Sequence, residues 1–198
     1  MQGPAPSFAS VSYLGQYANC FLLGQLGRKL VVIDQHAAHE RVLFEKYRQE
    51  FDQRKVAMQP LLVPVLMELT PALVAAVEAG KEMFERLGFA VEPFGGHTVA
   101  VKGVPVLLRQ RPPEPVVAAL LAELSDASEA TLSTLFHKTL STLACHSAVR
   151  AGDPMRPEEV TQLLRLMDTV DLSAYCTHGR PVVAFVEEGE VARWFKRT

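Results

Sequence analysis

Residues 29–45 read KLVVIDQHAAHERVLFE, and the hydrophobic pattern changes abruptly inside them. The aliphatic run at 29–34 is typical of a strand. From about residue 36 to residue 51, apolar residues recur every three or four positions, which predicts an amphipathic helix. Upstream, the apolar run at 17–25 and the turn residues at 27–28 predict a strand that pairs with 29–34. The segment is therefore predicted to be a β-hairpin that leads directly into a helix.

The composition is that of a folded globular protein, with 198 residues of which 48% are hydrophobic and 21% charged. Disordered and fibrous classes are excluded, and the length allows one domain or two small lobes. The 20 Lys and Arg residues are balanced by 22 Asp and Glu, so the chain lacks the basic excess of proteins that hold nucleic acid unaided. Three cysteines are too few for a disulfide framework and suit a reducing compartment. No apolar run reaches the roughly 18 residues that cross a bilayer, and no signal peptide is recognisable.

The rest of the chain predicts a mixed α+β domain. Prolines divide the middle into short pieces, so we expect residues 57–128 to be an insertion between two halves of one lobe, 11–56 and 129–198. The Pro/Ser/Ala-rich residues 1–10 are expected to be a linker remnant of a longer protein. Further helices are predicted at about 70–88, 130–150 and 157–167, and another follows the prolines at 112–115 and ends at about 124. Further strands are predicted at 61–69, 89–94, 98–104 and 182–186.

A candidate metal site begins where the first strand meets the helix. At 3.6 residues per turn, His36 and Glu40 lie one turn apart on the same helix face, where an imidazole and a carboxylate can share a divalent cation. Asp34 precedes the helix and could cap it or reach the same ion. The alternative is a capped helix with a partly exposed His and a solvated Glu, and this spacing alone favours that alternative.

Two neighbours of this pair have other expected roles. His39 is rotated away from His36, so we expect a surface or supporting position. Glu45 lies about 140° round the helix from Glu40, which makes a shared ion difficult. Pairing of Glu45 with Arg41, one turn back, is the preferred prediction.

Cysteines elsewhere could add soft ligands. Cys176 and His178 are two residues apart just before an apolar strand, so in an extended segment their side chains point the same way. Cys145 lies in the long predicted helix, where a lone cysteine is most often a small buried hydrophobe. Cys20 is predicted to lie in a strand and receives the same interpretation.

Taken together, these side chains form a mixed nitrogen, oxygen and sulfur set. Thiolates and imidazoles suit Zn²⁺, whereas carboxylates suit Mn²⁺ or Mg²⁺. No single spacing matches a zinc finger. Residues 36–40 carry the letters of an inverted zinc-protease motif in the wrong order, which is the one feature in favour of a zinc hydrolase acting on small substrates. The candidate ligands are Asp34, His36, Glu40, Cys145, Cys176 and His178.

Four blocks of sequence resemble a known family. DQHAAHERVLFE at 34–45 fits the pattern DQHAxxExxxxE, and the blocks ACHSAVR at 144–150, CTHGRP at 176–181 and FKR at 195–197 follow in order. This series resembles the C-terminal endonuclease domain of the MutL family of DNA mismatch repair proteins. Thr177 stands where proline is usual in the third block and Val182 where threonine often follows, and neither change removes a ligand.

The resemblance implies a two-lobed domain, with a dimerisation lobe built from both chain ends and a smaller inserted regulatory lobe. It implies a homodimer and a metal-dependent nicking endonuclease, with Asp34 and Glu40 catalytic and all six candidate ligands at the metal positions. Zn²⁺ would be structural or regulatory, and Mn²⁺ would support nicking. ATP would act only through a missing N-terminal domain, since no Gly-rich phosphate loop is visible here.

The resemblance also implies partners. The segment QPLLVP at 59–64 is similar to the QxxLxP segment by which such proteins bind the replication sliding clamp, through Gln59, Leu62 and Pro64. The alternative is a proline-rich edge strand. A mismatch-recognition protein and weakly bound double-stranded DNA are the other expected partners, in the bacterial cytoplasm and nucleoid, with no membrane. A competing hypothesis keeps the fold but makes the chain a non-catalytic dimerisation and docking module with a structural zinc site.

Overall fold

The computed structural model describes residues 7–53, 56–108, 112–125, 132–149, 152–171 and 181–197. The fold is α+β, as predicted. The chain divides into two compact units, one of Met1–Glu45 with Ala148–Thr198 and one of Lys46–Ser147. The second unit extends further along the sequence at both ends than the insertion expected at 57–128. Its boundaries fall within one helix, at Lys46, and at the end of another, at Ser147. Prolines mark loops, and they carry no information about a boundary within a helix.

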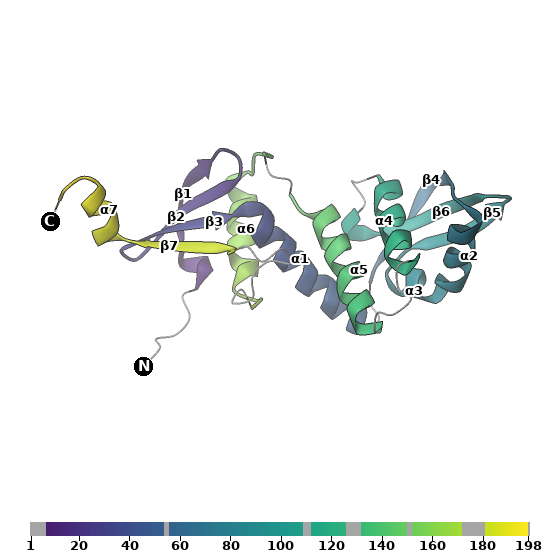
Figure 1. The fold of residues 1–198 in the computed structure, drawn as a ribbon. Helices are drawn as coiled ribbons and strands as arrows, with labels where there is room; N and C mark the ends of the chain where they lie inside the picture. Colours follow the sequence, from purple (N-terminus) through teal and green to yellow (C-terminus); the bar gives the residue numbers. More distant parts are fainter. Residues whose placement is uncertain are drawn as a thin grey trace. The chain divides into compact units, whose positions relative to one another are not determined.

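The first unit is built on a four-stranded antiparallel sheet in the order β1-β2-β3-β7 (Figure 1). The predicted hairpin is present as β2 and β3, with Gly27 in the turn at a φ of 59°. Strand β1 was not predicted, because its residues SYLGQY have a weak strand pattern and depend on pairing with β2. The strands are β1 (Ser12–Tyr17), β2 (Phe21–Leu26), β3 (Lys29–Asp34) and β7 (Val183–Glu187).

One face of this sheet packs on two helices, α1 (Gln35–Asp52) and α6 (Pro157–Met167). The helix start predicted at Pro157 is confirmed, and Glu159 accepts a hydrogen bond from the backbone N–H of Arg156 at 2.8 Å. Burial of apolar surface stabilises this arrangement. The core consists of Val11, Leu22, Val31, Ile33, Ala37, Ala38, Val42, Val160, Leu163, Leu164, Met167 and Val182.

The turn between β1 and β2 holds two residues in the left-handed region, Ala18 at a φ of 53° and Asn19 at 49°. The backbone N–H of Cys20 donates to the carbonyl of Tyr17 at 3.0 Å, which closes the turn. Cys20 therefore lies in this turn, and its predicted place in a strand was wrong. The apolar letters on both sides of Cys20 concealed the break between two strands.

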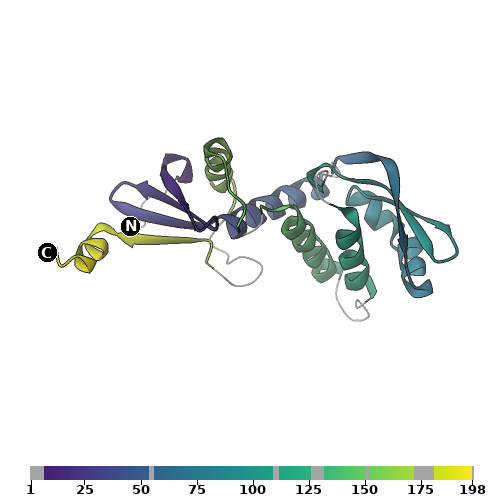
Figure 2. The same cartoon turned by 90° about the horizontal axis from the view of Figure 1, so that it is seen from above.

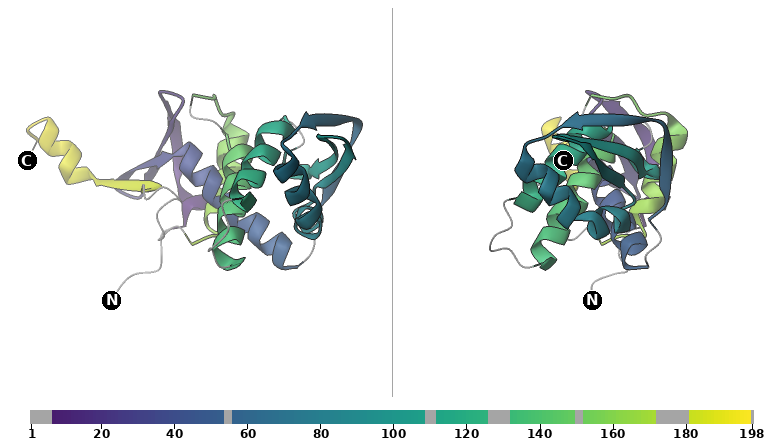
Figure 3. Two further views of the ribbon diagram at one scale, coloured as in Figure 1. Left: turned by 45° about the vertical axis from the view of Figure 1, so that its right-hand side comes forward. Right: turned by 90° about the vertical axis from the view of Figure 1, so that its right-hand side faces the viewer.

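The second unit has a three-stranded antiparallel sheet in the order β4-β6-β5, with β4 at one edge (Figure 3). The edge position of β4 agrees with the prediction made from Pro64. Helices α4 and α5 lie side by side (Figure 2). The bounds are β4 (Met58–Glu68), α2 (Pro71–Ala79), α3 (Lys81–Arg86), β5 (Ala90–Gly95), β6 (Thr98–Pro105), α4 (Pro113–Ser125) and α5 (Leu132–Ser147).

The helix predicted over 70–88 is split in two at Gly80. Glycine is a poor helix former, and here its backbone leaves the helical region with a φ of −88° and a ψ of 4°. The predicted cap is present, since Thr70 Oγ1 accepts from the N–H of Leu73 at 3.4 Å. Phe84 and Phe89 pack edge to face in the core of this unit, with ring centroids 6.2 Å apart.

Short elements complete the chain: the 3₁₀ helices η1 (Phe8–Ser10) and η2 (Val106–Leu108), and the helix α7 (Glu188–Trp194). Helix α7 follows β7 directly and contributes no buried residue (Figure 1). Within the described ranges, no helix combines the length and apolar character needed to span a bilayer.

Candidate functional site

The candidate site starts at Asp34, the last residue of β3. Asp34 Oδ1 accepts a hydrogen bond from the backbone N–H of Ala37 at 3.0 Å, so the carboxylate caps α1. The N–H of Asp34 donates to the carbonyl of Val182 at 3.0 Å. The cap that the sequence suggested is thus present, and it fixes one of the two carboxylate oxygens.

His36 and Glu40 come together as the helical spacing predicted. His36 Nε2 lies 3.9 Å from Glu40 Oε2, too far for a hydrogen bond. The side chain of Glu40 is only 3% exposed, whereas that of His36 is 34% exposed. The pair therefore places a buried carboxylate beside an imidazole that solvent can reach.

The backbone of Val149 sets the orientation of the His36 ring. His36 Nδ1 lies 2.8 Å from the carbonyl oxygen of Val149. A carbonyl oxygen only accepts, so Nδ1 carries the hydrogen, and in the neutral ring Nε2 presents its lone pair toward Glu40. An imidazole nitrogen and a carboxylate oxygen are both zinc donors, and each would lie about 2.1 Å from a bound ion. The donors at this point fit a divalent metal.

His39 also contacts the backbone of Val149. The N–H of Val149 donates to His39 Nδ1 at 3.0 Å. His39 is half-buried and supports the Val149 backbone, which is one of the two roles expected for it. Two histidines of α1 therefore hold the segment that follows α5.

The predicted pairing of Glu45 is confirmed. Glu45 Oε1 lies 2.9 Å from Arg41 Nη2, and both side chains are largely buried. Arg41 Nε donates to the carbonyl of Asp171 at 3.1 Å, and its guanidinium lies 5.7 Å from the centroid of the Phe44 ring. Glu45 thus has a structural partner, as expected from its place on the helix.

Three candidate ligands lie in other parts of the chain. Cys145 lies in α5, in the other unit, and is exposed, so the interpretation of it as a buried hydrophobe was wrong. Cys176 and His178 lie outside the described residues. Within the portions of the chain that are described, no group of three or more His, Cys, Asp and Glu residues could hold a metal ion.

Sequence reasoning missed a fully buried residue beside the site, Gln35. Its Nε2 donates to the carbonyls of Asn19 at 2.7 Å and Asp153 at 3.0 Å, and its Oε1 accepts from Nε2 of Gln16. The available clue was periodicity: position 35 lies three residues before Ala38 and seven before Val42, so it falls on the core face of the helix.

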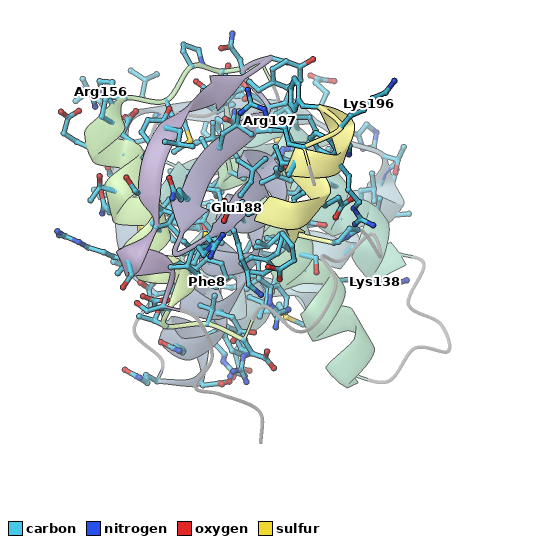
Figure 4. All side chains as sticks on the ribbon, turned by 90° about the vertical axis from the view of Figure 1, so that its left-hand side faces the viewer. Phe8, Lys138, Arg156, Glu188, Lys196 and Arg197 are labelled. Atoms are coloured by element: carbon cyan, nitrogen blue, oxygen red, sulfur yellow. The ribbon has the colours of Figure 1, made fainter. Side chains whose placement is uncertain are left out.

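The fourth block of the resemblance follows α7. Phe195 is 70% exposed, and Lys196 has a left-handed φ of 55°. Figure 4 shows Lys196 extending outward at the end of this helix. The block closes α7, since the N–H of Arg197 donates to the carbonyl of Ala192 at 2.9 Å.

The predicted clamp-binding residues lie on the edge strand β4. The regular pairing of β4 with β6 is interrupted between Pro60 and Val65, so the intervening residues leave the ladder. Leu62 is fully exposed, at 101% of its reference area, and Val63 is 72% exposed. An apolar side chain is thus presented to solvent at the position where the motif requires one.

Comparison with known proteins places the chain in a family. The family model for the MutL C terminal dimerisation domain matches residues 14–155. The DNA mismatch repair protein MutL of Anaeromyxobacter dehalogenans is 44% identical over 185 residues, which cover 91% of this chain and 30% of that protein. The MutL proteins of Pelobacter propionicus and Clostridium beijerinckii are 41% and 32% identical, over 98% of this chain and 32% and 29% of their own lengths. The chain thus spans about a third of these relatives, and it belongs to the MutL C-terminal dimerisation domain family.

Proposed function

We propose that this chain is the homodimerising C-terminal part of a DNA mismatch repair protein and that it carries a metal-dependent DNA-nicking site. The family match and the names of the relatives support the repair and dimerisation roles. The observation that carries the nuclease role is the pair formed by Glu40 and His36, in which a buried carboxylate lies 3.9 Å from Nε2 of an imidazole that is oriented through its Nδ1.

In this proposal, each ligand has a role that suits its chemistry. Asp34 and Glu40 supply the oxygen donors for Mn²⁺, and Asp34 is alternatively the general base. When bound, the cation offsets charge on the transferring phosphoryl group and activates water. His36 and the remaining ligands suit a neighbouring Zn²⁺ that orders the site. These remaining ligands are Cys145, Cys176 and His178.

The substitution Asp34→Asn tests the nuclease role without removing the helix cap. An asparagine oxygen still accepts from the N–H of Ala37, so α1 keeps its start while the negative charge is lost. We expect Mn²⁺-dependent nicking of supercoiled plasmid to be lost in Asp34→Asn and kept in Asp52→Asn, an exposed position at the end of the same helix. Equal nicking by wild type and Asp34→Asn would overturn the assignment.

A non-catalytic docking module with a structural zinc site is the second candidate function. It is favoured by the family match, which is to a dimerisation domain. This alternative predicts bound metal and a stable dimer with no nicking by the wild-type protein. The plasmid assay therefore separates it from the endonuclease.

We propose the outer face of the first unit's sheet as the dimer surface. The register puts Leu23 opposite Val32 and Leu30 opposite Val186, on the face away from the core. These aliphatic side chains are only half-buried, and Phe21 beside them is 37% exposed. A contiguous apolar sheet face of this kind is typical of a surface covered by a protein partner, here a second copy of the chain.

Sedimentation equilibrium tests this surface. We expect the wild-type chain to be a dimer and Leu30→Lys to be a monomer at the same concentration, since a charge in an apolar interface is left without a partner. The control is Leu66→Lys, at an exposed position on the edge strand of the other sheet. A dimeric Leu30→Lys protein would rule out this face.

We propose that the clamp-binding segment Gln59, Leu62 and Pro64 docks on the replication sliding clamp. The break in the β4 ladder frees an exposed leucine to enter an apolar pocket of the partner. Leu62→Ala should weaken binding to a purified sliding clamp at least tenfold, whereas Leu66→Ala, which removes an exposed leucine of the paired part of β4, should leave it unchanged. Equal affinities for the wild type and Leu62→Ala would contradict this docking role.

The partners are also expected to control cutting. The net charge of −2 gives little attraction for double-stranded DNA. We therefore propose that nicking depends on loading by the clamp and a mismatch-recognition protein. Strong nicking by the isolated chain at physiological salt would contradict this dependence.

A further inference from the structure

The amide of Gln35 makes three hydrogen bonds, although the side chain is fully buried. Both N–H groups donate to backbone carbonyls, those of Asn19 and Asp153, and the oxygen accepts from Gln16. These partners fix which amide atom is oxygen and which is nitrogen. A buried amide satisfied in this way holds its neighbours in one arrangement.

Gln16 of β1 completes the network. Its Nε2 donates to Gln35 and, at 3.1 Å, to the carbonyl of Asp153, while its Oε1 accepts from the N–H of Met155 at 3.2 Å. The carbonyl of Asn19, which Gln35 contacts, also accepts from the N–H of Gly152 at 2.9 Å. Residues 152–155 are thus bound through their backbone to β1, to the turn that follows it and to the first residue of α1.

The same start of α1 holds Val149, three residues before Gly152. The carbonyl of Val149 accepts from His36 Nδ1, and its N–H donates to His39. The carbonyl has to stay in place for Nδ1 to remain the protonated nitrogen. Because Gly152 follows Val149 by only three residues, we expect a shift of the 152–155 backbone to reach the carbonyl that orients His36.

We propose that Gln35, held by Gln16, is a positioning residue for the candidate metal site. It fixes residues 152–155 on α1, which keeps the Val149 carbonyl against His36 and aims Nε2 of that ring at Glu40. The inference rests on the proposed metal-dependent function, in which His36 and Glu40 are ligands. Gln35 itself acts through the backbone segment that it holds, and it needs no contact with the ion.

The test uses Gln35→Ala in the full chain, with two measurements. The first is the ¹⁵N chemical shifts of the His36 ring without metal, which report the tautomer. We expect one tautomer, protonated at Nδ1, in the wild type and a mixture in Gln35→Ala. The second is Zn²⁺ affinity by chelator competition, which should fall about tenfold, as is usual when a group that orients a ligand is lost.

The matched control is Gln25→Ala. Gln25 is an exposed glutamine of the same sheet whose Nε2 donates to the carbonyl of Gly27 at 2.9 Å, outside the network. It should leave both measurements at their wild-type values. If Gln35→Ala does not fold, Gln16→Ala replaces it, because that change removes the Met155 contact at a half-buried position and is judged by the same criteria.

The outcomes separate the inference from the function on which it rests. An unchanged tautomer and unchanged Zn²⁺ affinity in the folded variant overturn the positioning role, even if the wild type binds metal through His36. A wild type that binds no Zn²⁺ or Mn²⁺ removes the proposed function. In that case the tautomer measurement still decides whether Gln35 orients the ring.

Discussion

His36 and Val149 are joined by a hydrogen bond of 2.8 Å between the ring Nδ1 and the backbone carbonyl. This contact connects the first block of the family resemblance, at the start of α1, with the second, at the end of α5 and beyond. It gives the imidazole one orientation before any ion is present. The Glu40 carboxylate is then 3.9 Å from the other ring nitrogen. Two candidate ligands thus lie on one helix, and a backbone group from a distant segment orients one of them, His36.

The buried hydroxyl of Tyr47 is expected to stabilise the second unit. Tyr47 is 1% exposed, and its hydroxyl lies 3.3 Å from Ser147 Oγ, which in turn donates to the carbonyl of Leu143 at 2.7 Å. Tyr47→Phe should lower the free energy of unfolding by about 1 kcal/mol, the typical net value of one hydrogen bond. Urea denaturation measures this change, and Tyr17→Phe, at an exposed position, is the control.

The same residue predicts a pH dependence. Burial raises the pKa of Tyr47 far above its ordinary value, with a smaller opposing effect of the hydrogen bond to Ser147. In the unfolded chain the hydroxyl of Tyr47 ionises at about pH 10, whereas in the folded chain it stays protonated at that pH. The free energy of unfolding should therefore fall as pH rises above about 10. The slope of unfolding free energy against pH above 10 should be shallower in Tyr47→Phe. Identical slopes in the two proteins would contradict this origin.

Asp168 is expected to hold the beginning of the described chain. Its carboxylate accepts from the hydroxyl of Ser7 and from the backbone N–H groups of Phe8 and Ala9. Burial opposes ionisation, but these three hydrogen bonds outweigh it and lower the pKa of Asp168. A lowered pKa means that the attachment is complete above the ordinary Asp pKa of about 3.9 and weakens as pH falls below it.

Hydrogen exchange checks this attachment. Asp168→Ala should speed exchange of the Phe8 and Ala9 amides by about tenfold or more at neutral pH. The control Glu158→Ala, at the start of helix α6, whose end is capped by Asp168, should not change this exchange. Equal protection of both amides in wild type and Asp168→Ala would show that the carboxylate does not hold the segment.

The turn at Ala18 and Asn19 offers a stabilising change. Both residues have positive φ, and hairpin turns of this type prefer Asn followed by Gly. The double substitution Ala18→Asn with Asn19→Gly should raise the free energy of unfolding by about 1 kcal/mol, since an L-residue such as alanine costs about 1–2 kcal/mol in this region. The backbone carbonyl that binds Gln35 is retained. A less stable double variant in urea denaturation would count against this reading of the turn.

The elements predicted correctly are those with a strong local pattern. The aliphatic run at 29–34 and the helical period after it gave the hairpin and α1, and the charge spacing gave the pair of Arg41 and Glu45. These features depend on residues close in sequence. Local propensity and periodicity are then enough to specify them.

The features that were missed depend on distant contacts. Strand β1 exists because β2 pairs with it, and Gln35 is buried because Gln16 and residues 152–155 satisfy its amide. The local pattern around position 35 does not predict these partners, because they come from two other segments of the chain. The alternative interpretation of Cys145 as a buried hydrophobe rested on what is usual for lone cysteines, and only the folded α5 shows that this side chain is exposed.

The central claim is that distant segments supply ligands to one metal site, and metal analysis of purified protein tests it most directly. Wild type, His36→Ala, Cys176→Ala and the control Cys20→Ala would be purified in parallel with Zn²⁺ and analysed by mass spectrometry of the bound ion. We predict that the wild type and Cys20→Ala retain Zn²⁺ and that both His36→Ala and Cys176→Ala lose it. Equal metal content in all four proteins would contradict a common site.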